Sequence, residues 1–585
     1  MVNEIDVQKK NEDVVIDEAK TSLSDFWKLE DYWAIWIGLV ILIVGLFIFI
    51  PNPPSNMKED ICKCNTTLKN EASKAPFRTI AWYKASKSKN KIIAANEPYA
   101  KKIKSIFNKP KSWNLNPFEA VYLGKEAAEA KNSITRADYE KISKDLEIAF
   151  DKAGVSENAA ASADFKDNTL NDKAESDINS WLLLSNKLSK AKKKISNKPY
   201  NLIPSLIFLC IILMVLFGIG IFAMGNPIMP FTKGFIFVFS LAVIAYLIAG
   251  QHTNKSIGLG YPLWAIIIGM LISNTVGTPK WVVPAIQTEF YIKTGLVLLG
   301  AEVLFGKILN IGIPGIFVAW GVTPTVIVLS FWFGNKILKI QSKTLNITTS
   351  AALSVCGVSA AIATASACRA KKEELTLSIG LSLGFTAAMM VCMPAFIKAV
   401  GMDFILGGAW MGGTIDSTGA VAAAGEFLSD KAMYVSATIK MIQNVMIGVV
   451  AFFVAIYWCA KIECQPGQKV SPMEIWHRFP KFILGFAGTS ILFSLIYGIV
   501  GSDVGSVVIE GGVISNLSKL LRGWMFCLAF ISIGLATNFR EFKQYLKGGK
   551  LLTLYIFGQS FNLLLTLLIA YLMFYIFFPG ITANI

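Results

Sequence analysis

The sequence predicts an all-α polytopic membrane protein, and three observations lead to that class. Of the 585 residues, 54% are hydrophobic and only 16% are charged, whereas soluble domains carry about 25% charged residues. Apolar runs of about 20 residues, the length that crosses a bilayer, recur along the chain. Two further apolar segments consist mainly of small residues, a composition that predicts helices broken inside the membrane.

The first predicted elements are a tail, one crossing and an insert. Residues 1–31 are polar and are expected in the cytoplasm. The apolar run at 32–50 is too long for a signal-peptide core and lacks a small-residue cleavage site, so we expect it to remain as a membrane anchor. The charged stretch 51–202 predicts a helical soluble insert, which we expect outside the cytoplasm.

Ten more apolar runs follow the insert, which gives eleven predicted crossings. These runs lie near 203–224, 234–250, 262–274, 286–302, 311–333, 375–398, 434–459, 481–499, 519–537 and 551–578. Glu289 and Lys293 in one run have the i,i+4 spacing of a helical ion pair, so we expect them to pair with each other. The net charge of +16 resides mainly in loops and in the insert. Basic residues there set topology and meet anionic lipid, so no nucleic acid is expected as a partner.

The two remaining apolar segments, 348–368 and 404–426, contain much Gly, Ala, Ser and Thr and little Leu or Phe. Basic loops should lie in the cytoplasm. The richest of them are 334–347, 369–374, 460–481 and 538–550. All four share one side only if 348–368 enters and leaves the membrane on that side. The same reasoning makes 404–426 re-enter from outside.

The two segments also resemble each other. A shift of 60 residues places Cys356 over Asp416 and Lys371 over Lys431, and each segment is followed by a polar loop and a full crossing. With re-entrant segments the two units are inverted. Inverted repeats with interrupted helices near the bilayer midplane are typical of secondary transporters. We therefore expect residues 203–585 to form a transporter domain.

Broken helices predict a particular chemistry. A helix N-terminus exposed at the break offers oriented N–H groups to an anion. Residues beside the two breaks are the candidates for binding substrate: Ser354, Cys356, Gly357, Ser359, Thr414, Ser417, Thr418 and Gly419. Asp416 is an intramembrane carboxylate, which is functional by default, and we predict that it binds the coupling ion. Lys440 and Gln443 in the following crossing are candidate charge partners, for an anion or for Asp416.

Other chemistries are not supported. The chain has nine Cys and two His, without the paired spacing of a zinc site, so neither a metal nor another cofactor is expected. No phosphate-binding loop of the Walker type appears. Because no catalytic set is evident either, the chain is not expected to be an enzyme.

Three stretches carry a resemblance to a known family. Cys356–Ala360 (CGVSA) resembles the C-G-x-S-A motif of the YeiH-like bacterial sulfate exporter family, and Gly295–Gly300 resembles another motif. Thr414–Thr418 (TIDST), with Ala423–Gly425, resembles a third. Residues 29–38 are similar to the start of longer members. Many members have a His-Asp pair where this chain has Asp416-Ser417, so that proton coupling could differ here.

The resemblance implies a bacterial inner-membrane transporter, similar in fold to cation/proton antiporters and anion transporters. The leading hypothesis is secondary transport of a small anion, sulfate or an organosulfonate, coupled to H⁺ or Na⁺ by alternating access. One alternative is a monovalent cation/proton antiporter in which Asp416 binds the cation. Another is a membrane receptor or scaffold that acts through the insert. A homodimer is considered as the assembly.

Overall fold

The computed structural model describes residues 15, 22–257, 259–303, 305–462, 472–540 and 549–582. These residues are almost entirely helical, and their only sheet joins the two-residue strands β1 (Tyr122–Leu123) and β2 (Tyr200–Asn201). Nine helices of the described chain are long and apolar enough to cross a membrane. The predicted all-α polytopic class is therefore confirmed. Two of the eleven predicted crossings are short helices of 15 residues, so the count of eleven stays a prediction.

The membrane helices form two groups, distinguished by which helices pack together. We call the first the frame bundle. It contains α3 (Glu30–Phe49), α9 (Ile203–Ala223), α10 (Ile228–Gly250), α12 (Tyr261–Thr275), α13 (Thr288–Glu302), α23 (Phe482–Val500), α24 (Ser502–Gly505), η5 (Ser506–Ser518) and α25 (Lys519–Ala536). The short helices α2 (Asp25–Lys28) and α11 (His252–Ser256) lie at its ends.

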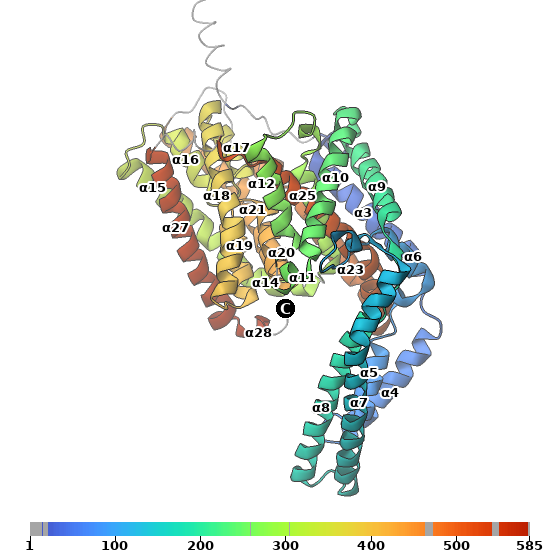
Figure 1. The fold of residues 1–585 in the computed structure, drawn as a ribbon. Helices are drawn as coiled ribbons and strands as arrows, with labels where there is room; N and C mark the ends of the chain where they lie inside the picture. Colours follow the sequence, from blue (N-terminus) through green and yellow to red (C-terminus); the bar gives the residue numbers. More distant parts are fainter. Residues whose placement is uncertain are drawn as a thin grey trace, which may run out of the picture.

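The second group is the broken-helix bundle. It contains α14 (Phe305–Ile316), η4 (Phe317–Gly321), α15 (Val322–Lys336), α16 (Lys343–Ala352), α17 (Ser359–Ala367), α18 (Lys372–Ala399), α19 (Phe404–Thr414), α20 (Thr418–Leu428), α21 (Asp430–Lys461), α27 (Gly549–Tyr571), η6 (Leu572–Phe577) and α28 (Pro579–Thr582). The short α22 (Met473–His477) packs on α21. Figure 1 shows the two bundles side by side.

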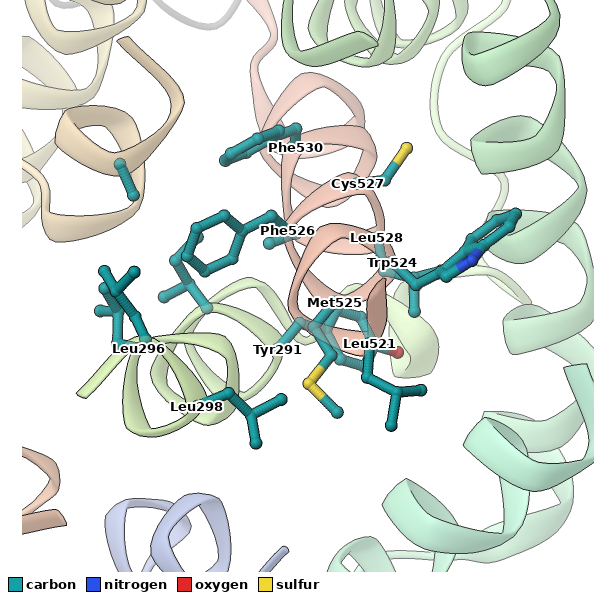
Figure 2. Packing of buried hydrophobic residues seen from close by; sticks show 14 of the residues in the cluster. Tyr291, Leu296, Leu298, Leu521, Trp524, Met525, Phe526, Cys527, Leu528 and Phe530 are labelled. Carbon is teal, nitrogen blue, oxygen red and sulfur yellow. The ribbon is translucent and has the colours of Figure 1, made fainter. Parts of the chain in front are cut away.

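Helix α25 is the central element of the frame. The apolar part of the segment that ends with α25 is 78% buried, because its side chains meet neighbours on every side. Figure 2 shows Trp524 and Phe526 on opposite sides of α25, with Leu296 of α13 next to Phe526. On another side, α25 crosses α12 at Gly534, where the backbones touch and no side chain would fit. A close helix crossing of this kind needs small residues.

The first broken segment enters and leaves on one face. Thr344, at the start of α16, donates a hydrogen bond to Glu374 at the start of α18 (2.8 Å), and Ser342 donates to the same carboxylate. Both helices therefore begin at the same level, and α17 returns the chain to it. Lys550 contacts the Lys339 carbonyl there (3.4 Å). We call this side the basic face, because the described parts of the four basic loops meet on it.

The second broken segment lies at the other end of α18. Gly407, in the first turn of α19, abuts Leu428 at the end of α20, and Gly408 abuts Ala432 at the start of α21. The chain thus enters and leaves at the opposite side, which we call the insert face. Because one hairpin comes from each face, their tips meet inside the bundle.

The insert divides into a base and an arm. Its helices are α4 (Met57–Lys74), α5 (Ile80–Lys89), η1 (Ala94–Asn96), α6 (Pro98–Ile106), η2 (Pro117–Ala120), α7 (Lys125–Ser162) and α8 (Asn168–Lys194). The long pair α7–α8 projects from the insert face (Figure 1). The base packs on the frame, since Trp113 donates to the Leu247 carbonyl (2.7 Å) and Trp524 donates to the Phe107 carbonyl (3.1 Å). The stretch predicted as a soluble insert thus includes residues that help to cover the membrane helices.

Candidate functional site

The two helix breaks meet at the centre of the broken-helix bundle. One break joins α16 to α17, and the other joins α19 to α20. The Gly357 N–H donates to the Asp416 carbonyl (2.6 Å), so the two breaks are directly hydrogen-bonded. Any side chain at Gly357 would collide with Ser382 of α18. Glycine is required here because the two backbones approach so closely.

Lys440 of α21 joins the breaks through its ammonium group. Its Nζ donates to the carbonyls of Val355, in the first break, and Ile415 (2.8 Å), in the second. The third donor goes to Gln443 Oε1 (2.7 Å). An ammonium group has three donors, and all three are used. Lys440 is 1% exposed, so its charge neutralises the carbonyl ends of α16 and α19, which carry negative partial charge.

Gln443 makes a second bridge one turn further along α21. Its amide Nε2 donates to the carbonyls of Ser354 and Gly413, each at 3.0 Å. Lys440 and Gln443, both predicted as charge partners, therefore contact backbone carbonyls of both breaks. A side chain lost here would leave buried carbonyls without donors, which is costly in a membrane.

A polar stripe on α27 covers the breaks from another direction. Tyr555 donates to Asp416 Oδ2, Gln559 donates to the Thr414 carbonyl (3.0 Å), and Asn562 donates to the Leu353 carbonyl (3.3 Å). These three residues were missed in the sequence analysis. Their i, i+4, i+7 spacing in an otherwise apolar crossing was the available signal, because it places them on one helix face.

Of the residues that the structure describes, Asp416 is the one acidic residue at the two breaks. It is 1% exposed, and its carboxylate accepts the hydrogen bond from the Tyr555 hydroxyl. The nearby ammonium of Lys440 contacts the carbonyls rather than this carboxylate. Ser382 of α18 contacts the same tyrosine hydroxyl. Asp416 is thus held by the Tyr555 hydroxyl of α27 and lies close to one cation, the ammonium of Lys440.

A cavity of about 550 Å³ reaches the breaks from the basic face. Four residues line its deep end: Cys356, Ser359, Thr418 and Asn444. Asn444 is buried and donates to Thr418 Oγ1 (2.9 Å), while its own Oδ1 has no hydrogen-bond partner. We call this space the break cavity. An unpartnered buried oxygen at its deep end marks a place where a donor group could bind.

Two helix N-termini face the break cavity. Helix α17 begins at Ser359 and α20 begins at Thr418, and neither has a side chain that caps its first N–H groups. Both N-termini carry positive partial charge. The carbonyl ends of α16 and α19, by contrast, are covered by Lys440, Gln443 and α27. The accessible side of the breaks is therefore the side that favours an anion.

The other candidate residues lie close by but do not all point into the cavity. The hydroxyls of Ser354 and Thr414 bond the carbonyls of their own helices, Ser350 (2.6 Å) and Trp410 (2.5 Å). Gly419 is packed against Ile533 and Ile292. Ser417 precedes α20 without capping it. Of the eight predicted substrate residues, Cys356, Ser359 and Thr418 line the break cavity.

The mouth of the break cavity carries charges of both signs. Lys293 lies 2.8 Å from Glu30 and 2.9 Å from Asp31, both in the first turn of α3, and 3.9 Å from Glu289. The expected pairing of Lys293 with Glu289 is therefore secondary to its pairing with α3. Arg478, also at the mouth, donates to Ser366 of α17 (3.1 Å).

On the insert face, ion pairs join the two bundles. Arg522 of α25 contacts Glu302 of α13 and Glu426 of α20, each at 3.0 Å. The side chains of Arg522 and Glu302 are each 1% exposed. Nearer the surface, Lys519 pairs with Asp430 of α21 (2.7 Å). Glu426 and Asp430 belong to the broken-helix bundle, so these contacts close the insert face.

Residues 233–554 match the family described as Conserved hypothetical protein 698. A UPF0324 membrane protein of Nitratidesulfovibrio vulgaris is 57% identical over 572 residues, which cover 98% of this chain and 99% of the relative. The chain belongs to the UPF0324 membrane protein family.

Two members from other organisms align with a smaller part of the chain. One from Rhodopirellula baltica is 57% identical over 64% of this chain and 68% of its own length, and one from Nitrosomonas europaea is 32% identical over 53% and 68%. No solved structure matches the chain. Together with the apolar helices, these names identify a multi-pass membrane protein of a bacterial family. They state no substrate, so the sulfate specificity suggested by the motifs stays a prediction.

Proposed function

We propose that this UPF0324 protein is a secondary active transporter of a small anion, of the sulfate or organosulfonate class. The observation that carries the proposal is the polarity of the breaks. The N-termini of α17 and α20 open on the break cavity with the hydroxyls of Ser359 and Thr418. The carbonyl ends are occupied by Lys440 and by amide side chains. Oriented N–H groups and hydroxyls are the ligands that small oxyanions use.

Alternating access fits the same arrangement. The break cavity opens on the basic face, which the positive charge of its loops predicts to be cytoplasmic. The insert face is closed by the ion pairs of Arg522 and Lys519. In the opposite state, α20 and α21 would separate from α25, and the anion site would open on the insert face.

The test is flux of labelled sulfate in proteoliposomes with imposed pH or Na⁺ gradients. We compare wild type with Asp416→Asn. Sulfate flux should follow one gradient in the wild type and lose that dependence in the variant, because the variant cannot ionise. Asp138→Asn is the matched control, since the same substitution at an exposed position of α7 leaves both the breaks and the ion pairs of the insert face intact.

A cation/proton antiporter is the second candidate, and the buried carboxylate of Asp416 between broken helices favours it. Absence of sulfate flux, with cation-dependent proton movement that Asp416→Asn abolishes, would replace the anion proposal with this one. If the protein is a receptor or scaffold that acts through the insert, neither sulfate flux nor cation-dependent proton movement is expected. Retained transport after removal of the α7–α8 arm would count against that third reading.

A further inference from the structure

We infer that the coupling ion is a proton carried by Asp416, and that protonation of Asp416 and binding of the anion in the break cavity favour each other. This inference rests on the proposed function. It specifies proton–anion symport, in which both ions cross in the same direction. Three features of the breaks lead to it, namely the occupied carbonyls, the single carboxylate and the fixed charge of Lys440.

The first feature argues against Na⁺ at the unwound backbone of the breaks. In broken-helix transporters, Na⁺ is coordinated by backbone carbonyls at the unwound segments. The seven carbonyls of residues 353–355 and 413–416 each accept a hydrogen bond here, from Asn562, Gln443, Lys440, Gln559 or Gly357. Two of them accept from the Lys440 ammonium. A cation brought to these oxygens would meet a fixed positive charge at close range.

The second feature, the single carboxylate of Asp416, is suited to binding a proton. Asp416 Oδ2 is bound by one neutral donor, the Tyr555 hydroxyl, and no other acidic residue in the described part of the chain shares the breaks. A protonated carboxyl needs only a single hydrogen-bond partner, and a tyrosine oxygen can accept as well as donate. Tyr555 can therefore serve both states of Asp416 by rotating its hydroxyl hydrogen, with no change in the backbone.

The third feature couples the proton to the anion. The titratable or charged groups that face Asp416 are Tyr555 from α27 and Lys440 from α21, and the Cys356 thiol of the first break lies near Lys440. With Asp416 ionised, its charge and that of Lys440 cancel. With Asp416 protonated, the breaks carry a net charge of one positive unit beside the two helix N-termini. An anion then enters a favourable potential, and by linkage a bound anion favours the protonated carboxyl to the same extent.

Tyr555 acts as a positioning residue. Its hydrogen bond favours the ionised form of Asp416, because a donor stabilises negative charge. Removal of the hydroxyl should let Asp416 keep its proton to higher pH. The anion should then stay bound to higher pH, although Tyr555 itself lies outside the lining of the break cavity.

The experiment is a binding titration of sulfate to the purified full-length protein from pH 5 to 9, by calorimetry in buffers of different ionisation enthalpy. The wild type should take up one proton per sulfate above the midpoint, where Kd rises about tenfold per pH unit. Asp416→Asn should bind sulfate with a Kd independent of pH. Tyr555→Phe should move the midpoint to higher pH, whereas Tyr571→Phe, at the exposed end of α27, should not.

Different failures have different meanings. Sulfate binding that requires Na⁺, or that tightens as pH rises, would overturn proton symport and leave the anion transporter standing. If the protein binds neither sulfate nor methanesulfonate at any pH or Na⁺ concentration, the proposed function itself fails. If Tyr555→Phe lowers affinity equally at all pH values, its role is structural and the positioning argument is wrong.

Discussion

The contacts between the two bundles differ between the basic face and the insert face. On the basic face the bundles stand apart around the break cavity, and the ion pairs of Lys293 connect α13 with α3, both within the frame. On the insert face, Arg522 and Lys519 of the frame pair with Glu426 and Asp430 of the broken-helix bundle. The bundles would have to break the ion pairs of Arg522 and Lys519 in order to separate on the insert face.

The difference teaches that charged contacts between the bundles gather on the insert face, where they add to the apolar packing of α20 against the frame. An ion pair can exchange protein partners for water when a face opens. A buried pair and an exposed pair should, however, contribute unequally, because solvent screens the exposed one. Three substitutions on this face test that ranking.

The largest effect is expected from Arg522→Leu. The substitution leaves the carboxylates of Glu302 and Glu426 without their cation, and removing one partner of a buried pair costs about 3–5 kcal/mol. Thermal unfolding in detergent should show a strongly lowered midpoint. Lys519→Leu, one turn earlier and half-exposed, should change it little. A triple variant with Leu at 302, 426 and 522 should regain stability, and a triple variant as unstable as the single one would contradict this account.

A medium effect is expected from Glu426→Gln. Arg522 keeps Glu302, but the charged contact between the bundles is lost, at about 1.5–3 kcal/mol for a hydrogen bond to a charged group. The equilibrium should shift toward opening of the insert face. The readout is the side from which a membrane-impermeant thiol reagent modifies Cys356, which is 8% exposed and lines the break cavity.

Modification of Cys356 from the basic face should fall, and modification from the insert face should rise, both followed by mass spectrometry of the peptide. Glu373→Gln, at the exposed start of α18, is the matched control. Equal labelling of wild type and Glu426→Gln from both sides would mean that this contact does not hold the insert face closed.

The smallest effect is expected from Asp430→Asn. The side chains of Asp430 and Lys519 are each 47% exposed, and exposed pairs contribute about 0–1 kcal/mol. The same labelling assay should show a change well below that of Glu426→Gln, and 0.5 M salt should remove it. A shift as large as that of Glu426→Gln would reverse the proposed order of the two contacts.

Much of the fold follows from composition and periodicity. The long apolar runs predicted the membrane crossings. The small-residue segments and the basic loops around them predicted that the first broken segment enters and leaves on one face, as the contact of Thr344 with Glu374 shows. The short helices α12 and α13 were harder to place. Both helices pack against α25, and hydrophobicity alone does not encode that packing.

The site was predicted in part. Asp416, Lys440 and Gln443 stood out because ionisable or amide side chains are rare in apolar helices. The donors from α27 were missed, because nothing local indicates that a helix some 140 residues away in sequence lies beside Asp416. Arg522 was also missed. Arg522 lies near the polar start of the apolar run 519–537. Only the packing of α20 against α25 shows that its side chain is buried.

The base of the insert has a practical consequence. In the described part of the chain, an ion pair and two hydrogen bonds attach it to the frame, through Asp503 of α24, Leu247 of α10 and Trp524 of α25. The arm should therefore keep a constant orientation to the frame while the other bundle rocks. A fluorophore at the tip of the arm would be a stationary reference point against which the excursion of a second dye, on α18 or α27, could be followed in single molecules during turnover.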